Sequence, residues 1–132
     1  MVIEVNTQSP SPIYEQLRDQ VVLGIAAKKL ALGEVLPSVR SLGADLGINF
    51  HTVSKAYSML YDEGYIVMDR RQGAVVAQTV PGGDVFLSKL SGEILLAAAE
   101  SVCRGMAESE FISLCKDCYK NAKGDLENGG TL

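Results

Sequence analysis

The spacing of apolar residues predicts a helix near the start of the chain. Apolar side chains recur every four positions there, which is the period of one helix face: Ile13, Leu17, Val21 and Ile25. We expect Ser11 to cap this helix and Pro12 to be its first residue, where its missing N–H is harmless. The helix should run to about Leu30 and stop before Gly33.

Two shorter helices should follow. Ser38 is the expected N-cap of the first, which carries apolar residues at Val39, Leu42 and Leu46 and ends at Gly47. Asn49 can cap the next, and Gly64 ends it. Its expected buried stripe is Val53, Ala56, Tyr57 and Leu60. The tight turn at 47–49 between two short helices has the spacing of a helix-turn-helix.

A β-hairpin should come next. Tyr65 to Met68 and Ala74 to Gln78 are β-prone runs, and the loop between them has Gly73 near its end. Glu34 to Leu36 should also be extended, because Pro37 disfavours the helical conformation before it. A helix-turn-helix followed by a hairpin is typical of a winged helix-turn-helix domain, which we place at residues 1–79.

The rest of the chain predicts a hinge and two helices. Residues 80–83, Val-Pro-Gly-Gly, form the hinge. Residues 84–123 should form two helices that Gly105 separates, with Ser109 as cap of the second. Their apolar positions are Leu87, Leu90, Ile94, Ala97, Ala98 and Val102, then Phe111, Leu114, Cys115, Cys118 and Ala122. Residues 124–132 should be a disordered tail. The predicted fold class is mainly α with one small β-hairpin.

Composition and charge narrow the function. Of 132 residues, 47% are apolar and 21% charged, which fits a globular protein rather than a disordered one. The first dozen residues contain Glu4 and no apolar run, and no run approaches a membrane span, so we expect a cytoplasmic protein. The net charge of −4 alone argues weakly against nucleic acid. However, residues 1–78 have 7 basic and 8 acidic side chains, whereas residues 79–132 have 5 and 8, so the acidity is concentrated in the C-terminal part.

The stretch from Pro12 to Ala77 resembles the DNA-binding domain of the GntR family of bacterial transcription regulators. The matching segments are 12–17 (PIYEQL), 36–42 (LPSVRSL), 46–49 (LGIN), 52–57 (TVSKAY), Leu60, 63–66 (EGYI) and Gly73. The amino-acid sequence from Asn49 to Tyr57 and the short C-terminal part are most similar to those of the YtrA subfamily. The chain departs from the family pattern at three positions. Phe50 stands where a basic residue or proline is usual, Gly43 where alanine is usual, and Arg71 where a second glycine is usual.

The resemblance implies a DNA-binding regulator, most simply a repressor, that acts as a homodimer on an inverted-repeat operator. In this subfamily the regulated genes often form a transporter operon. It implies no enzymatic activity and no cofactor. The expected partners are double-stranded DNA, a second copy of the chain and an unidentified small-molecule effector acting through the hinge, with no membrane partner. The alternative functions are a protein-interaction module and a thiol-redox sensor using Cys115 and Cys118.

The candidate DNA contacts come from three segments. Once the buried stripe of the third helix is set aside, the side chains facing outward are His51, Thr52, Ser54, Lys55 and Ser58. The resemblance implies that Asn49, His51 and Thr52 lie closest to DNA. Without it, a small solvated polar face explains these residues as well.

Arg40 and the hairpin tip complete the candidate set. Arg40 lies in the first turn of a helix, where the macrodipole disfavours a cation, and the resemblance implies a phosphate or base contact. A salt bridge of Arg40 to Asp45 or Glu34 is the structural alternative. The tip has Arg70, Arg71, Gln72 and Gly73, which can reach phosphates or the minor groove or simply solubilise a turn.

The C-terminal helices have wide apolar faces that they cannot bury alone. A second copy is the simplest partner for these residues: Phe86, Leu87, Leu90, Ile94, Ala98 and Phe111. The C-x-x-C at Cys115 and Cys118 is a weak redox or zinc signal. We expect both cysteines to pack as small apolar residues instead.

Overall fold

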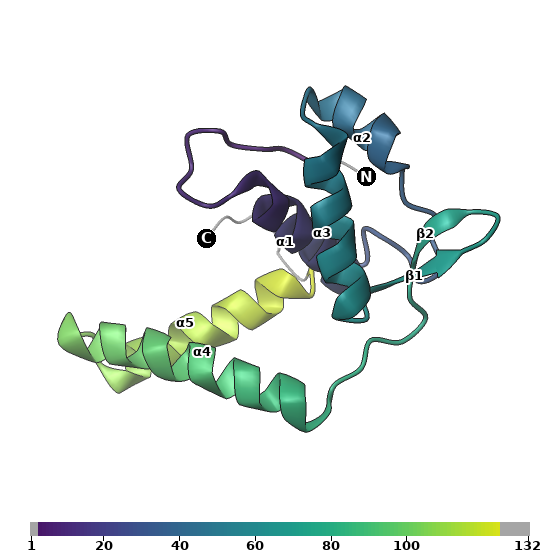
Figure 1. The fold of residues 1–132 in the computed structure, drawn as a ribbon. Helices are drawn as coiled ribbons and strands as arrows, with labels where there is room; N and C mark the ends of the chain where they lie inside the picture. The colour runs from purple at the N-terminus through teal and green to yellow at the C-terminus, as the bar shows by residue number, and fades with distance from the viewer. Residues whose placement is uncertain (1–2, 125–132) are drawn as a thin grey trace. The chain divides into compact units, whose positions relative to one another are not determined.

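The structure is a computed structural model that describes residues 3–124. The chain contains five helices and one antiparallel hairpin within these residues (Figure 1). It divides between Val80 and Pro81 into two compact units. The first holds α1 (Ile13–Ala26), α2 (Val39–Leu46), α3 (Phe50–Asp62), β1 (Ile66–Asp69) and β2 (Gly73–Val76). The second holds α4 (Gly83–Cys103) and α5 (Glu108–Ala122). The predicted fold class is confirmed.

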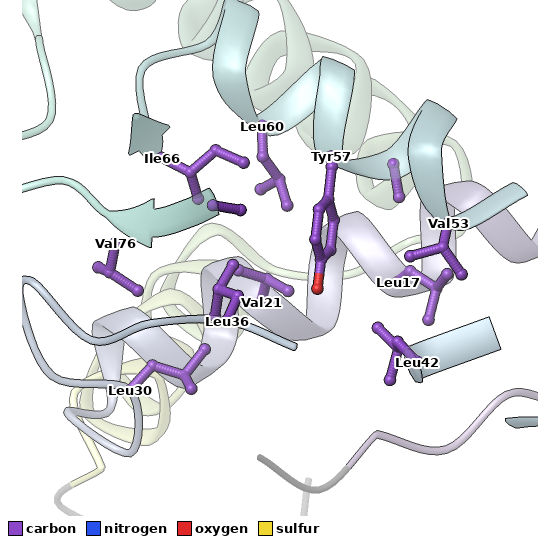
Figure 2. Packing of buried hydrophobic residues seen from close by; sticks show 12 residues of the cluster. Leu17, Val21, Leu30, Leu36, Leu42, Val53, Tyr57, Leu60, Ile66 and Val76 are labelled. Carbon is purple, nitrogen blue, oxygen red and sulfur yellow. The ribbon is translucent and has the colours of Figure 1, made fainter. Parts of the chain in front are cut away.

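The core of the first unit lies between α1 and α3, and both α2 and β1 also pack on α3 (Figure 2). Burial of this apolar surface is the main favourable term in folding. Every element of the unit contributes buried apolar side chains, including Leu17, Val21, Leu42, Val53, Ala56, Tyr57, Leu60, Ile66 and Val76. All four members of the predicted stripe on α3 are among them, which confirms that stripe.

The helix-turn-helix has the predicted caps. The Ser38 hydroxyl accepts a hydrogen bond from the Ser41 N–H (3.1 Å), and the Asn49 side chain accepts one from the His51 N–H (2.9 Å). Gly47 adopts a left-handed conformation with φ 69° and ends α2. Each cap satisfies a backbone group that the helix end leaves unpaired.

A third extended segment lies beside the hairpin, as predicted for Glu34 to Leu36. The register pairs Ile66 with Val76 and Asp69 with Gly73, and Val35 forms a bridge to Val75. The Leu36 N–H also donates to the Ala74 carbonyl (2.9 Å). The hairpin is thereby tied to the chain that leads into α2.

The predicted boundaries of α1 are wrong at both ends. Pro12 has an extended ψ of 147° and is the N-cap, so Ser11 lies outside the helix. The helix ends at Ala26 because Lys28 adopts a left-handed conformation (φ 62°) and turns the chain back. Leu30 is then buried against Gly24, where a Cβ would lie 3.0 Å from the Leu30 Cδ1.

The second unit consists of two helices with no buried side chain. α4 begins at Gly83, which we had placed in the hinge, and Gly105 (φ 80°) ends the turn after it, as predicted. The predicted cap at Ser109 is wrong: Ala107 is the N-cap of α5, and Glu110 accepts a hydrogen bond from its N–H (3.4 Å). The predicted disordered tail lies outside the described residues, apart from Gly124.

Two polar contacts reinforce the core of the first unit. The Arg18 guanidinium donates to both carboxylate oxygens of Glu63 (2.9 and 2.8 Å), which joins α1 to the end of α3 and raises the pKa of Arg18. The buried Tyr57 hydroxyl donates to the Pro37 carbonyl (2.7 Å). Both contacts give buried or half-buried polar groups a partner.

Tyr57 makes the stability of the protein sensitive to alkaline pH. Burial raises the pKa of Tyr57 from 10.0 to about 12. The contribution of the neutral Tyr57 hydroxyl to the free energy of unfolding is therefore complete below about pH 10. It is lost as the pH rises to about 12, which lowers the free energy of unfolding by about 2 kcal/mol. Between these pH values the wild type should lose about 2 kcal/mol more unfolding free energy than Tyr57→Phe, measured in urea. Equal losses in the two proteins would contradict this role.

Candidate nucleic-acid interface

One side of α3 faces away from the core of its unit. His51, Lys55 and Ser58 are exposed there, and Thr52 and Ser54 are half-buried. Because Asn49 caps the helix through the His51 N–H, its side chain is oriented along the backbone at the same end. The structure therefore gathers Asn49, His51 and Thr52 at the N-terminal end of α3, as the sequence predicts. Their side chains provide amide, imidazole and hydroxyl groups for hydrogen bonding.

Arg40 lies beside this end of α3. Its guanidinium carbon is 4.2 Å from the centroid of the Phe50 ring, a cation–π contact. Within residues 3–124 Arg40 forms no ion pair, so the salt bridge to Asp45 or Glu34 that we considered is absent there. The positive charge of Arg40 is exposed rather than neutralised by a neighbouring carboxylate.

Lys55 is held in a similar way further along α3. Its Nζ lies 3.9 Å from the centroid of the Tyr14 ring. Tyr14 is half-buried and packs against the core of the first unit. Like Arg40, Lys55 has no ion pair among the residues that the structure describes. Two uncompensated cations therefore lie at this surface: Arg40 beside the first residue of α3, and Lys55 on the helix itself.

The hairpin tip has a defined backbone and free side chains. One oxygen of Asp69 accepts hydrogen bonds from the N–H groups of Arg71 (2.7 Å) and Gln72 (3.0 Å), and Gly73 has φ 80°. Arg70, Arg71 and Gln72 are all exposed, and neither arginine forms an ion pair within the described chain. Figure 1 shows the hairpin projecting from the helices of its unit. A fixed turn with two free arginines can present positive charge to a phosphate backbone.

The predicted dimerisation residues lie on the two helices of the second unit. Phe86, Leu87, Leu90 and Ile94 are exposed on α4, whereas Ala98 and Phe111 are half-buried. Our expectation that Cys115 and Cys118 pack as core residues is wrong for this chain, because both side chains are exposed, as is Cys103. The reason is that the second unit has no core of its own. Across residues 3–124, no group of three or more His, Cys, Asp or Glu side chains could hold a metal ion.

Sequence comparison identifies the family. A model of the family described as bacterial regulatory proteins, gntR family, matches residues 12–76. YhcF of Bacillus subtilis, described as an uncharacterized HTH-type transcriptional regulator, is 34% identical over 88 residues, 67% of this chain and 73% of that protein. The chain belongs to the GntR family. The transcriptional repressor YtrA of Bacillus subtilis is 36% identical over 77 residues, 58% of this chain and 59% of YtrA. These relatives are described as transcription regulators, and this GntR-family chain is a DNA-binding transcription regulator.

Solved structures agree with this assignment. A GntR-family transcription factor from Sulfolobus acidocaldarius, also called YtrA, has a TM-score of 0.63 and 38% identity, covering 75% of this chain and 99% of that one. A protein of Listeria monocytogenes EGD-e described as a transcriptional antiterminator has the same fold over 98% of both chains (TM-score 0.88, 24% identity). AraR(DBD), solved in complex with operator ORX1, has a TM-score of 0.52 and 26% identity over 58% of this chain and 99% of its own. No helix within residues 3–124 has the length and apolar character that a membrane span requires.

Sequence reasoning missed three residues that shape this surface. Phe50 and Tyr14 each place a ring beside a cation, and Asp69 organises the hairpin tip. The sequence predicts the loop that begins at Asp69, but not that the Asp69 carboxylate accepts hydrogen bonds from two backbone N–H groups of the tip, which is a common role of aspartate in turns. The ring–cation pairs bring together residues 10 and 41 positions apart, so no local pattern reveals them.

Replacing the cap of α3 tests its structural role separately from any contact with DNA. Asn49→Ala should lower the free energy of unfolding by about 1 kcal/mol, because the His51 N–H loses its acceptor. Asn49→Ser is the matched control, since a serine hydroxyl can accept the same hydrogen bond. Urea unfolding of both variants without DNA measures the effect. A stability of Asn49→Ala equal to that of the wild type would contradict the role of the cap.

Proposed function

We propose that this GntR-family regulator binds an inverted-repeat operator as a homodimer and represses transcription by occupying DNA that the polymerase needs. The observation that carries the proposal is the exposed side of α3, where hydrogen-bonding side chains occur together with the unpaired cation Lys55 and, beside the Phe50 ring, with Arg40. A surface of this kind suits DNA, because cations contact phosphates while amide, imidazole and hydroxyl groups contact base edges. YtrA of Bacillus subtilis, a relative, is named a repressor.

In this proposal α3 enters the major groove with its N-terminal end at the bases. Asn49, His51, Thr52 and Ser54 then face base edges or the adjacent phosphates. Arg40 and Lys55 contact the backbone on either side. AraR(DBD), which is similar to 58% of this chain, is bound to an operator in its structure, and this similarity supports DNA binding by the present chain.

The hairpin tip supplies the second set of contacts. Arg70 and Arg71 are free of ion pairs within the described chain and lie on a turn fixed by Asp69. They can contact phosphates or enter a narrow minor groove, where the negative potential is enhanced. Gln72 adds a hydrogen-bonding group, and Gly73 gives the turn its left-handed backbone. The tip therefore adds affinity beside the α3 contacts.

The second unit supports the homodimer. α4 and α5 have no buried side chain, and Phe86, Leu87 and Ile94 are 44%, 58% and 49% exposed. Helices this apolar are found buried, not solvated. A second copy offers the same apolar face in a two-fold arrangement. Two DNA-binding units related by a two-fold axis match an operator built as an inverted repeat.

Selection from a random duplex library tests sequence-specific binding. We expect an enriched sequence with two-fold symmetry. In fluorescence anisotropy this duplex should bind tightly and a scrambled duplex weakly. Tripling the salt concentration should weaken binding at least about tenfold, because several phosphate contacts release counterions. Failure to enrich any sequence would contradict the proposal and favour a winged-helix protein-interaction module.

Two substitutions on α4 test the dimer. Ile94→Asp and Leu96→Asp each place a charge at an exposed apolar position, and the two positions lie about 200° apart around the helix. Ile94 belongs to the proposed interface and Leu96 does not. Light scattering should show a monomer for Ile94→Asp and a dimer for Leu96→Asp. A monomeric wild type, or a dimer unaffected by Ile94→Asp, would contradict this interface.

A further inference from the structure

Phe50 is the first residue of α3, and its ring joins two polar side chains of the candidate interface. The Arg40 guanidinium carbon lies 4.2 Å from the ring centroid. The His51 ring lies 4.2 Å from it, centroid to centroid, at an interplanar angle of 33°. Phe50 is half-buried while Arg40 and His51 are exposed. The ring therefore lies beneath the surface whose polar groups face outward.

Gly43 lies where the start of α3 packs closely on α2. A Cβ at Gly43 would lie 3.0 Å from the Ile48 carbonyl oxygen and 3.2 Å from the Phe50 Cα. The missing side chain thus lets the turn and the start of α3 approach α2 closely. Arg40 and Gly43 are three residues apart on α2 and share one face of that helix. Arg40 therefore lies on the face of α2 that the start of α3 approaches, where its guanidinium meets the Phe50 ring.

The ring is a well-matched partner for this arginine. The Arg40 guanidinium contacts the Phe50 ring and has no carboxylate partner within residues 3–124. A planar guanidinium stacks on an aromatic face and keeps its N–H donors free at the edge. A carboxylate partner would instead occupy those donors and cancel the charge. Stacking therefore orders the arginine without using the groups that a phosphate or a base would need.

We propose that Phe50 is a positioning residue that holds Arg40 in the orientation in which it contacts DNA. The inference rests on the proposed DNA-binding function and adds to it a residue with no hydrogen-bonding group of its own. A side chain ordered before binding loses less rotamer freedom in the complex. Phe50 thereby increases affinity through Arg40. The competing role, in which the Phe50 ring itself contacts a thymine methyl group, is a distinct outcome of the test.

A double-mutant cycle on the full-length protein tests the coupling. The variants are Phe50→Leu, which keeps an apolar side chain but removes the ring, Arg40→Ala, and the two combined. Affinity for the selected duplex is measured at several salt concentrations. Phe50→Leu should weaken binding about three- to tenfold, the range of a cation–π contact that becomes desolvated. The combined variant should bind no more weakly than Arg40→Ala, within about twofold.

Two further variants control for indirect effects. Phe50→Tyr keeps the ring and should bind within about twofold of the wild type. Tyr14→Leu removes the ring beside Lys55 instead, so its effect should add to that of Arg40→Ala. Each variant should keep the wild-type Tm to within a few degrees, which separates positioning from unfolding.

The salt dependence of binding and the pattern of affinities distinguish failure of the positioning role of Phe50 from failure of the proposed DNA-binding function. Arg40→Ala should reduce the slope of log affinity against log salt by about one phosphate contact per protomer, and Phe50→Leu should move the slope in the same direction. Additive losses for Phe50→Leu and Arg40→Ala would overturn the positioning role and indicate a direct contact of the ring with a base. Unchanged affinity of Arg40→Ala would overturn both the DNA contact of Arg40 and the inference. If the wild type itself shows no sequence-specific binding, the proposed function is overturned.

Discussion

The one-sided burial of α3 is the constraint on which the rest of the first unit depends. Val53, Ala56 and Leu60 have no exposed surface, since they pack against α1 and the neighbouring elements. The helix cannot rotate without bringing polar side chains into this core, which is costly when they find no partner there. Core packing therefore decides which residues face outward. The proposed DNA-binding surface consists of the α3 positions that do not pack into this core.

The charges of the proposed interface reconcile DNA binding with the acidic composition of the protein. The net charge of −4 belongs to the whole chain, whereas Arg40, Lys55, Arg70 and Arg71 lack ion pairs within the described residues. Elsewhere in the same unit Arg18 is paired with Glu63 and Asp19. Aromatic rings, rather than carboxylates, hold Arg40 and Lys55 in place. Local pairing therefore matters more than total charge, because exposed charges farther apart than a Debye length are largely screened.

Much of the fold could be predicted from the sequence because its signals are local. Periodic apolar residues, the caps Ser38 and Asn49 and the glycine at the end of α2 act within a few positions of one another. The errors arise where distant residues decide. α1 ends early because Leu30 turns back to bury itself against Gly24, and no propensity reveals that contact.

The candidate site was predictable to a smaller extent. The outward positions of α3 follow from its period, and the DNA-facing role came from the resemblance rather than from the residues alone. The ring–cation pairs remained hidden, since they join α2 to α3 and α1 to α3 across the fold. The predicted burial of Cys115 and Cys118 was wrong for a related reason. An apolar helix face predicts burial, but it does not specify whether the surface that covers it comes from the same chain.

In the proposed homodimer, the apolar second unit links oligomerisation to DNA affinity by mass action. Leu87 and Ile94 of α4 are 58% and 49% exposed in the single chain, so the free energy of covering them is released only when the proposed second copy binds. One DNA-binding unit makes too few contacts to select a site in a genome, and a pair doubles them. Covering these helices and engaging the second half-site are then thermodynamically coupled. Operator DNA should stabilise the dimer to the same extent that dimerisation strengthens operator binding, because such coupling is reciprocal.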